Sequence, residues 1–340
     1  MHIAIFGAGT VGVYIGGRLA AAGGDVVLIG RARLRDALAG GLTVSDYRGY
    51  EARVAPPFAT DAAAVRGVDL VLVCVKSRDT RSAAEAIRPH LSPDAQVVSF
   101  QNGLGNAGLL ETALDRDVLP GMVGFNVVQE GARFHQATEG GLHVLDDPVL
   151  DPVLPLFRRA GLPLHEHADM QPVLWAKLML NLNNAVNALS GLPLRAQLSQ
   201  RDYRRCLALA QDELLSLCAA AEHPLARLSP LPARWIPPVL RLPDRLFRAV
   251  AGRMLRIDPT ARSSMADDLA HGRLTEVDWI NAEVVRLAES LGRDAPVNRE
   301  LTALIHAAEA GGIPRRWTAS ALLAHLTDAA AHEDPRGAPF

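Results

Sequence analysis

The sequence is short of lysine. Of its 35 basic residues only Lys76 and Lys177 are lysines, and the other 33 are arginines. The compact ammonium group of lysine can give up its proton when it is withdrawn from water, whereas the rigid guanidinium of arginine stays protonated. A chain that uses arginine almost everywhere is expected to keep lysine where arginine fails. Both lysines are therefore candidates for a functional role, and the alternative is that they are the remainder of a skewed composition.

Cysteine is also scarce. Cys74, Cys206 and Cys218 lie far apart and form no C-x-x-C pair. This is typical of reduced thiols in a protein core, not of a disulfide framework or a zinc site. The run His165-Glu166-His167 alternates and lacks the helical spacing of many metal ligands. We interpret it as part of a strand end or loop, and we predict no metal site.

Two further absences limit the partners that the protein can have. The formal net charge is -2 at pH 7 and the arginines are scattered, so no nucleic-acid surface is expected. No stretch approaches the roughly 18 apolar residues of a membrane span, and no signal-like segment precedes the first expected strand. These features predict a cytoplasmic protein that binds neither nucleic acid nor membranes.

The first 30 residues contain a strand, a glycine turn and a helix in that order. An apolar run at residues 3–6 precedes the G-x-G-x-x-G pattern at Gly7, Gly9 and Gly12, and an Ala-, Leu- and Gly-rich segment follows. In such a turn the first glycine allows the tight bend, the second lets a pyrophosphate approach the backbone, and the third lets the helix pack on the strand. The pattern predicts a dinucleotide site, with a purely structural turn as the alternative.

The start of the helix after this turn should complete the site. Thr10 and Val11 belong to the glycine turn that leads into this helix. The N–H groups at a helix N-terminus have no partner within the helix, and the helix dipole favours negative charge there. We therefore expect Thr10 and Val11 to bind the cofactor phosphates.

The residues after the second expected strand, 26–29, select the cofactor. An NAD site usually has Asp or Glu at this place to bind the ribose hydroxyl. Here Gly30-Arg31 stands in its place, and Arg33 and Arg35 follow. A guanidinium suits a phosphate monoester, so Arg31 predicts NADPH as the cofactor. Arg33 and Arg35 fit a phosphate contact and a solvated loop equally well.

The pattern of the next hundred residues predicts an open α/β sheet. A small hairpin is expected at 42–54, and the apolar runs 68–75 and 96–100 are typical of strands buried on both faces. Lys76 directly follows the first run, and Asn102 lies two residues after the second. Because ligands bind at the carboxyl ends of parallel strands, we expect both side chains beside the glycine turn. Further strands are expected at 118–128 and 142–145, with Gly140-Gly141 as the turn between them.

A change from strands to helices divides the chain. We predict the α/β class, with an N-terminal Rossmann-type dinucleotide-binding domain at residues 1–167, a mainly α-helical domain at 168–330 and a frayed tail at 331–340. The apolar periodicity predicts helices over 170–190, 203–221, 235–255, 265–291 and 298–308. Prolines between residues 224 and 243 indicate a loop or a kinked insertion.

One helix of the second domain carries polar residues among apolar ones. Lys177, Asn181 and Asn184 are spaced i, i+4 and i+7, which places them on one face. Buried polar groups have to be satisfied or used, and Lys177 is the sole lysine of this domain, so a ligand cleft is expected. An amide-rich seam between domains or subunits is the alternative. Glu276 also lies among apolar residues.

Together these motifs resemble the ketopantoate reductase (2-dehydropantoate 2-reductase) family, from Met1 to about Ile305. The motifs that carry the resemblance are Gly7 to Gly12, Gly30-Arg31, Val75-Lys76, Gln101-Asn102-Gly103, Trp175-x-Lys177-Leu178-x-x-Asn181, Ser263-Ser264-Met265 and Thr275-Glu276-x-Asp278-x-Ile280-Asn281. The resemblance implies reduction of 2-dehydropantoate to pantoate by hydride transfer from NADPH, a step towards pantothenate and coenzyme A. It implies a cleft between the two domains.

The resemblance also implies roles for particular residues. Lys177 would be the general acid, and Glu276 would bind the substrate hydroxyl and support Lys177, keeping it charged. Ser264 would hold the substrate carboxylate. The remaining expected contacts are Asn181 and Asn184 to the substrate, and Lys76 and Asn102 to the nicotinamide side of the cofactor and the substrate.

Two departures leave the substrate open. Members of the family usually have a second asparagine eight residues after the lysine, where this chain has Ala185, with Asn184 one residue earlier. The proline-rich insertion at 228–258 also exceeds the family pattern. The alternatives are a reductase of a different 2-keto acid or of an imine, and a protein that senses NADP without chemistry. The sequence does not fix the oligomeric state, a homodimer included.

Overall fold

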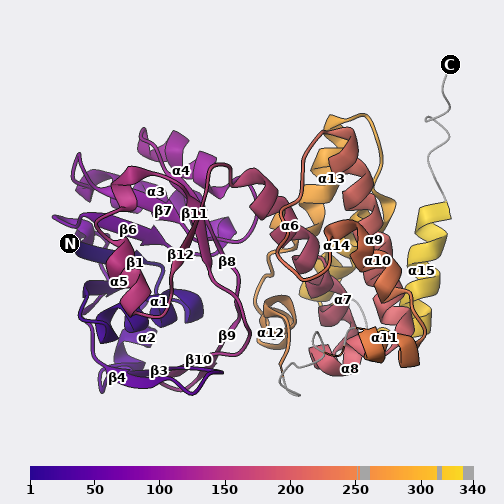
Figure 1. Cartoon of the computed structure of the whole chain (residues 1–340), viewed down its shortest axis with the longest axis horizontal. Helices are drawn as coiled ribbons and strands as arrows, with labels where there is room; N and C mark the ends of the chain where they lie inside the picture. The colour runs from indigo at the N-terminus through magenta and orange to yellow at the C-terminus, as the bar shows by residue number, and fades with distance from the viewer. Residues whose placement is uncertain (251, 253–260, 312–315, 332–340) are drawn as a thin grey trace. The chain divides into compact units, whose positions relative to one another are not determined.

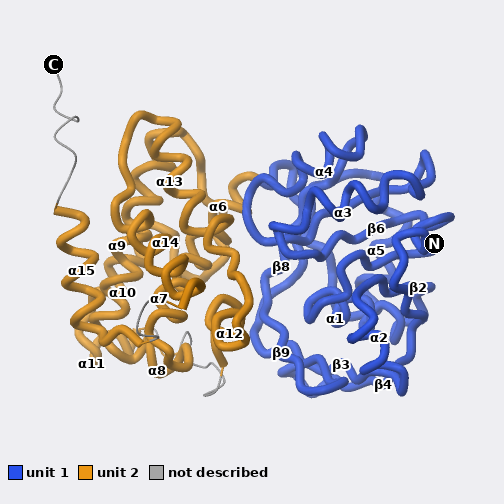
Figure 2. The backbone as a smooth tube through the Cα atoms, turned by 180° about the vertical axis from the view of Figure 1, so that it is seen from behind, with its two compact units in different colours: residues 1–170 blue, residues 171–340 orange. Residues whose placement is uncertain are grey.

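The computed structural model describes residues 1–250, 252, 261–311 and 316–331. The chain divides into two compact units, Met1–Met170 and Gln171–Phe340 (Figure 1, Figure 2). Unit 1 combines strands and helices, whereas the described part of unit 2 is helical. The expected boundary after residue 167 would fall at the last residue of strand β12 (Leu164–His167), a few residues before the division between the units. Within the described ranges no helix has both the length and the apolar character to cross a membrane.

Unit 1 is built on an eight-stranded sheet with the order β12-β11-β8-β7-β6-β1-β2-β5. The strands besides β12 are β1 (His2–Phe6), β2 (Asp25–Ile29), β5 (Phe58–Ala59), β6 (Leu70–Val73), β7 (Gln96–Ser99), β8 (Leu119–Val123) and β11 (Leu142–Leu145). All pairs from β5 to β8 are parallel, and β11 runs antiparallel to β8. The carboxyl ends of β1, β6 and β7 therefore meet at one edge, where open α/β sheets bind ligands.

Both faces of this sheet are covered, which explains its nearly continuous apolar strands. Side chains of successive residues point to opposite faces. Ile3 and Ile5 belong to one buried cluster and Ala4 to another. The first cluster includes residues of α1 (Thr10–Ala21) and α5 (Leu154–Arg159), and the second includes residues of α3 (Thr80–Ile87) and α4 (Asn106–Leu114). The short helix α2 (Ala32–Ala37) follows β2.

A second sheet of four strands lies against α1. Its order is β4-β3-β10-β9, with β3 (Leu42–Asp46), β4 (Glu51–Val54), β9 (Val127–Glu130) and β10 (Arg133–Gln136). The hairpin expected at 42–54 is confirmed as β3 and β4. The single strand expected at 118–128 is wrong, because it comprises β8 in the large sheet and the start of β9 in the small one. The exposed side chains of β9 give it no apolar periodicity that would have separated the two.

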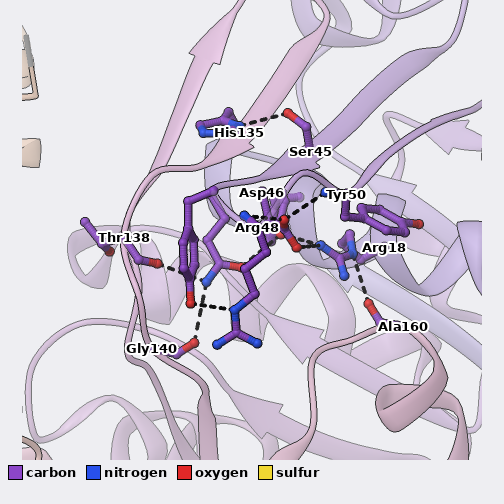
Figure 3. A network of polar contacts seen from close by, with 12 residues as sticks. Arg18, Ser45, Asp46, Arg48, Tyr50, His135, Thr138, Gly140 and Ala160 are labelled. Atoms are coloured by element: carbon purple, nitrogen blue, oxygen red, sulfur yellow. Dashed lines mark hydrogen bonds and ion pairs between the residues drawn. The ribbon is translucent and has the colours of Figure 1, made fainter. Parts of the chain in front are cut away.

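Arg18 of α1 ties the second sheet to the rest of unit 1 (Figure 3). Its buried guanidinium donates to the Asp46 carboxylate at 3.0 Å, the Tyr14 hydroxyl at 2.8 Å and the Ala160 carbonyl at 2.9 Å. The same group lies 3.8 Å from the centroid of the Tyr50 ring. A buried charge is tolerated only with such a set of partners. These contacts fix α1, and with it the glycine turn, against β3.

Tyr14 extends this network to the neighbouring strand. Its hydroxyl donates to Gln136 of β10 at 2.9 Å. Burial raises the pKa of Tyr14 to about 12, so the hydroxyl stays protonated and able to donate. Two strands of the small sheet are thus bonded to one helix.

Unit 2 contains ten α-helices among the described residues. They are α6 (Gln171–Asn181), α7 (Asn183–Ser190), α8 (Leu194–Leu198), α9 (Arg201–Ala220), α10 (Ile236–Leu240), α11 (Asp244–Val250), α12 (Ser264–Ala270), α13 (Asn281–Ser290), α14 (Pro296–Glu309) and α15 (Ala319–Ala331). The last described residue of the expected tail, Ala331, ends α15, and residues 332–340 lie outside the described part. Residues 251 and 253–258 of the proline-rich insertion also lie outside it.

Three of the expected long helices are divided. The expected helix 170–190 has a break at Leu182, between α6 and α7. The helix expected at 265–291 is two helices separated by Gly272, whose φ of 63° lies in the left-handed region, and by the 3₁₀ turn η6 (Val277–Trp279). The helix expected at 235–255 is α10 and α11 in its described part, separated at Pro243. Gly272 adopts a left-handed conformation that other residues avoid, and Pro243 cannot donate a helical hydrogen bond, so both interrupt their helices, whereas the break at Leu182 involves neither residue type.

The described part of the proline-rich insertion is folded onto α9. Arg204 of α9 is fully buried and donates to the carbonyls of Leu240 and Leu242, at 3.0 and 2.7 Å. It also donates to the Asp244 carboxylate at 2.9 Å, and its guanidinium lies 4.1 Å from the centroid of the Phe247 ring. One arginine thus satisfies the last carbonyl of α10 and a carbonyl of the following turn, and anchors the beginning of α11.

Candidate active site

The three glycines of the turn in unit 1 are needed for different reasons. Gly7 has a φ of 97°, and a Cβ there would meet the Val75 nitrogen at 2.5 Å. A Cβ on Gly12 would meet the Gly7 carbonyl oxygen at 2.5 Å. Gly9 is exposed, and a Cβ there would have no heavy atom nearer than 4.0 Å. The packing of the protein requires glycine at 7 and 12 but not at 9, where the missing side chain leaves the backbone accessible to a ligand.

The N-terminus of α1 begins at this accessible position. Gly9 is its N-cap and supplies no side-chain cap, and no acidic residue lies in the first turn. The N–H groups of Thr10 and Val11 precede the first helical hydrogen bond, which Val13 donates to the Gly9 carbonyl. The Thr10 hydroxyl also lies 3.4 Å from the Gln129 side-chain oxygen of β9. This end of the helix has the donors and the dipole that suit a phosphate.

Arg31 follows β2 and is largely in solvent. Its side chain is 84% exposed, and its one ion pair among the described residues, with Asp79, is 3.8 Å long. A pair this exposed is worth little, so the guanidinium can exchange the carboxylate for a phosphate at small cost. Arg35 instead donates to Asp36 at 2.8 Å, and Arg33 is exposed. Arg31 thus lies at the end of β2 with a weakly held guanidinium, whereas the guanidinium of Arg35 is bonded to Asp36.

A buried network fixes the two loops that carry Lys76 and Asn102. The Asn102 carbonyl accepts hydrogen bonds from the Ser77 hydroxyl at 2.6 Å and the Asn106 amide at 2.5 Å. The Thr80 hydroxyl donates to the Asn106 side-chain oxygen at 2.8 Å. Ser77, Thr80 and Asn106 are all at most 3% exposed. Since buried polar groups have few alternative partners, the loops after β6 and β7 hold one geometry, with Lys76 and Asn102 half-buried on them.

Lys177 lies half-buried on α6, between the buried Ala176 and Leu178. Burial lowers the pKa of Lys177 from its usual 10.5 to about 8. Removal from water disfavours the charged ammonium, which is the whole cause of this change. An amine with such a pKa can hold or release a proton near neutral pH.

Asn181 and Asn184 lie on the same side of the helix pair as Lys177. All three are half-buried, whereas Leu178 and Leu182 are buried. The Leu182 N–H donates to the Leu178 carbonyl at 3.1 Å, so the helical spacing continues through the break between α6 and α7. The three polar side chains therefore form one open face within unit 2.

Ser264 begins α12 and is exposed, but its neighbour Ser263 makes the contacts. The buried Ser263 hydroxyl accepts the Ala266 N–H at 3.1 Å and lies 3.2 Å from the Asn184 carbonyl. The Ser263 N–H donates to the Asn187 side-chain oxygen at 2.9 Å. These bonds join the start of α12 to α7. Ser263 was expected only as part of a motif and Asn187 was given no role, although a serine directly before a helical segment is a known N-cap signal.

Glu276 is buried, with 7% of its surface exposed, and directly precedes η6. Its backbone is defined by a Trp279 N–H that donates to its carbonyl at 3.0 Å. The preceding Thr275 N–H donates to the Glu309 carboxylate at 2.7 Å. The carboxylate is thus carried on a short segment held by backbone contacts.

The histidines near the end of unit 1 lie on the neighbouring strands β11 and β12. No group of three or more metal-ligating side chains occurs in the ranges that the structure describes. His165 and His167 lie on β12, and the nitrogens of His143 and His167 are 2.9 Å apart. These rings stack on one another, as side chains on neighbouring strands do.

The candidate residues divide into two groups, one in each unit. The group in unit 1 comprises Gly7, Gly9, Thr10, Val11, Gly12, Arg31, Lys76 and Asn102. The group in unit 2 contains Lys177, Asn181 and Asn184 on one helix pair, Ser264 at the start of the helix bonded to it, and Glu276 on a separate segment. Each group is consistent with the chemistry expected of it, the first with phosphates and the second with an acid and amide donors.

Two family models match this chain. One, described as ketopantoate reductase PanE/ApbA, matches residues 3–146, and the other, its C-terminal domain, matches residues 169–309. The chain belongs to the ketopantoate reductase family. The resemblance seen in the sequence and the expected fold class, a Rossmann-type domain followed by a helical one, are confirmed.

Relatives in the family match over nearly the whole chain. The chain is 30% identical to the 2-dehydropantoate 2-reductase of Halobacterium salinarum, over 92% of this chain and 100% of that protein. It is 28% identical to the enzyme of the same name from Archaeoglobus fulgidus, over 91% and 98%. A solved PanE/ApbA family ketopantoate reductase from Ralstonia eutropha has 32% identity and a TM-score of 0.79, over 92% and 99%. A D-mandelate dehydrogenase bound to NADH and anilino(oxo)acetate shares the fold, with a TM-score of 0.76, 20% identity and coverage of 92% and 99%.

Proposed function

We propose that this protein reduces 2-dehydropantoate to pantoate with NADPH, a step towards pantothenate and coenzyme A. The observation that carries the proposal is Lys177, a half-buried lysine with a pKa of about 8 on an open polar face. It stands in a chain that otherwise has almost no lysine. The relatives named 2-dehydropantoate 2-reductase, which match along nearly their full length, support the same activity.

Unit 1 is the part of the chain that would bind the dinucleotide. Gly9 leaves open space where a side chain would otherwise stand, and α1 offers the N–H groups of Thr10 and Val11. The pyrophosphate would be held there, with Gly7 and Gly12 maintaining the shape of the loop. A bound reduced nicotinamide would supply a hydride. Lys76 and Asn102, on their fixed loops, would orient the nicotinamide side and the substrate.

Arg31 would distinguish NADPH from NADH. It lies where NAD enzymes usually have a carboxylate, and its exposed guanidinium can form a paired contact with a 2′-phosphate. The carboxylate that pairs with it, Asp79, belongs to the loop after β6 and can be displaced. NADPH is therefore the cofactor that this site favours.

Lys177 would supply the proton of the reaction. Negative charge builds on the keto oxygen as the hydride is added to the carbon, and a positioned acid lowers the energy of this state. The Lys177 ammonium donates its proton to that oxygen, which yields the hydroxyl group of the product and a neutral amine. Arginine could not perform this step, because it does not release its proton.

Other side chains of unit 2 would position the substrate for that transfer. Asn181 and Asn184 share the face of Lys177 and carry amide groups that can bind the oxygens of a keto acid. Ser264, exposed at the start of α12, would donate to the substrate carboxylate. Glu276 would accept a hydrogen bond from the substrate hydroxyl and hold it for Lys177.

The test is the rate of NADPH oxidation, followed by its absorbance, with ketopantoate at saturating cofactor and with NADH as the control. Fast turnover with NADPH and slow turnover with NADH is the expected result. Tight NADPH binding without turnover of ketopantoate would contradict the proposed substrate. Equal rates with the two cofactors would contradict the role of Arg31.

A different 2-keto acid or an imine could be reduced by the same chemistry. The two departures from the family pattern, Ala185 and the proline-rich insertion, are both expected to affect which substrate is bound. A panel of keto acids and imines in the same assay would identify such a preference. A protein that only senses NADP would bind NADPH and turn over none of them. That alternative leaves Lys177, Asn181 and Glu276 without a role.

We also infer that the protein works in the cytoplasm and forms a homodimer. Three well-separated cysteines suit a reducing compartment. A ketopantoate reductase from Staphylococcus aureus is described as dimeric, and it matches this chain with a TM-score of 0.70 at 17% identity. Light scattering on the purified protein would measure its mass directly, and the mass of a single chain would contradict the dimer.

A further inference from the structure

The segment that carries Glu276 is held by three side chains of α14, and Arg286 of α13 also donates to its Asp278 carbonyl. Side chains of α14 contact residues 275–281 at the beginning, the middle and the end. The pairs are Glu309 with the Thr275 N–H at 2.7 Å, His306 with Asp278 at 3.0 Å, and Asn298 with Asn281 at 3.0 Å. Glu276 lies directly beside the first of these contacts.

The three side chains of α14 share one face of the helix. His306 and Glu309 follow Asn298 by eight and eleven residues. At about 100° per residue these spacings place all three within an arc of about 80°. The face therefore acts as one support along the length of the segment.

The inner end of this support is fixed to the rest of unit 2. Asn298 is fully buried and donates to the Ala210 carbonyl at 3.0 Å and the Glu213 carboxylate at 2.7 Å. Glu213 also accepts the N–H groups of Val297 and Asn298, at 2.7 and 3.0 Å. Burial raises the pKa of Glu213, and these backbone donors oppose that change. A carboxylate from α9 thus caps α14, whose own N-cap residue is Ala295.

The outer end depends on Glu309. Its half-buried carboxylate accepts the backbone N–H of Thr275, and the Thr275 hydroxyl in turn accepts the Val277 N–H at 3.2 Å. Hydrogen bonds to a charged acceptor are the stronger ones. Glu309 is also the last residue of α14, where the helix dipole disfavours a carboxylate. Its presence there is not explained by the stability of the helix, but it is explained by the contact with Thr275.

We propose that Glu309 is a positioning residue, which sets the place of the Glu276 carboxylate through the backbone of Thr275. The inference rests on the proposed function, in which Glu276 binds the substrate hydroxyl. Glu309 itself touches no substrate in this scheme. Its removal would allow the backbone before Glu276 to shift, while the lysine face and the dinucleotide loop stay unchanged.

The chain offers a matched set of variants. Glu309→Ala removes the acceptor, Glu309→Gln keeps an acceptor oxygen without the charge, and Glu300→Ala removes a carboxylate of the same helix that contacts His325 of α15 at 2.6 Å. Because small displacements at a reacting centre are costly, we expect Glu309→Ala to lower kcat about 10- to 100-fold. The KM for NADPH should stay unchanged. Glu309→Gln should recover most of the activity, and Glu300→Ala should resemble the unmodified protein.

A measurement that does not depend on turnover completes the test. Amide hydrogen exchange of the peptide that covers residues 274–281 should become faster in Glu309→Ala and stay slow in Glu309→Gln and Glu300→Ala. Unchanged exchange in Glu309→Ala would overturn the inference, even if the unmodified protein does not reduce ketopantoate. Faster exchange with an unchanged kcat would also overturn it. Absence of turnover in the unmodified protein, with the expected exchange pattern, would overturn the proposed function but keep the support of this segment by Glu309.

Discussion

Arg18 in unit 1 and Lys177 in unit 2 are both cations withdrawn from water, but their surroundings differ. The Arg18 side chain is 4% exposed and meets a carboxylate, a hydroxyl, a carbonyl and an aromatic ring. Lys177 is half-buried, and burial alone lowers its pKa to about 8. A buried cation that is surrounded by hydrogen-bond acceptors, such as Arg18, stays charged and anchors the structure. A cation whose pKa is lowered by burial, such as Lys177, can transfer a proton. Arg204 repeats the first pattern in unit 2.

The most direct way to break this comparison is to change the residue type at position 177. Lys177→Ala should lower kcat by about 10²- to 10⁴-fold, since it removes the acid that meets the developing charge. Lys177→Arg should be nearly as inactive, because a guanidinium keeps its proton. Steady-state kinetics give kcat, and a fluorescence titration gives the affinity for NADPH, which should remain nearly intact. Activity close to normal in Lys177→Arg would show that charge alone suffices, and lost NADPH binding in Lys177→Ala would count against the assigned role.

The buried arginines Arg18 and Arg204 differ in how exposed their carboxylate partners are, and this difference predicts different losses of stability. Arg18→Met leaves the Asp46 carboxylate, 11% exposed, without its counterion, and we expect a loss of about 3–5 kcal/mol in the free energy of unfolding. Arg204→Met leaves Asp244, which is 46% exposed and can be rehydrated, so the loss should be about 1–3 kcal/mol from the unpaired carbonyls. Urea unfolding followed by circular dichroism measures both. Equal losses would contradict the idea that burial of the partner decides the cost.

The sequence was most informative where a function depends on local geometry. The glycine turn could be predicted because Gly7 and Gly12 must be glycine for the backbone to close, and a Cβ at either position would meet a backbone atom at 2.5 Å. Lys76 and Asn102 could be placed because each lies three residues after the end of an apolar strand, β6 or β7. The face of Lys177, Asn181 and Asn184 followed from helical spacing, which the break at Leu182 preserves.

The sequence was least informative where distant residues cooperate. Arginine is seldom buried, and the carboxylate and the carbonyl that Arg18 binds lie 28 and 142 residues away, so the sequence near Arg18 did not mark it as an anchor. Strand β9 was missed as a separate strand because three of its four residues are exposed. Glu309 could not be connected with Glu276 either, because the bond runs through the backbone of Thr275, and a backbone N–H leaves no pattern in the sequence.

The lowered pKa of Lys177 predicts opposite pH dependence for activity and stability. The acid must be protonated, so kcat should be level below pH 8 and should fall about tenfold per pH unit above it. The folded pKa lies below the unfolded value of 10.5, so this group disfavours the folded state below pH 8 and ceases to do so as the pH rises towards 10.5. Rate profiles and thermal unfolding in the same buffers measure both effects. Lys177→Met should lose this contribution to stability, and an unchanged stability profile in that variant would assign the effect to another group.

Arg31 provides the contrast with the buried arginines, since it is 84% exposed and pairs weakly with Asp79. Arg31→Ala should therefore leave the unfolding midpoint unchanged and raise the KM for NADPH about tenfold, because one exposed charge-assisted contact is lost. The KM for NADH, which has no 2′-phosphate, should not change. Arg33→Ala, a change of another exposed arginine two residues away, is the matched control. If both variants weaken NADPH binding equally, the phosphate is held by the general positive charge of this loop. A loss confined to Arg31→Ala would instead locate cofactor selection at the end of β2, and would show that arginine in this chain serves recognition when exposed and anchoring when buried.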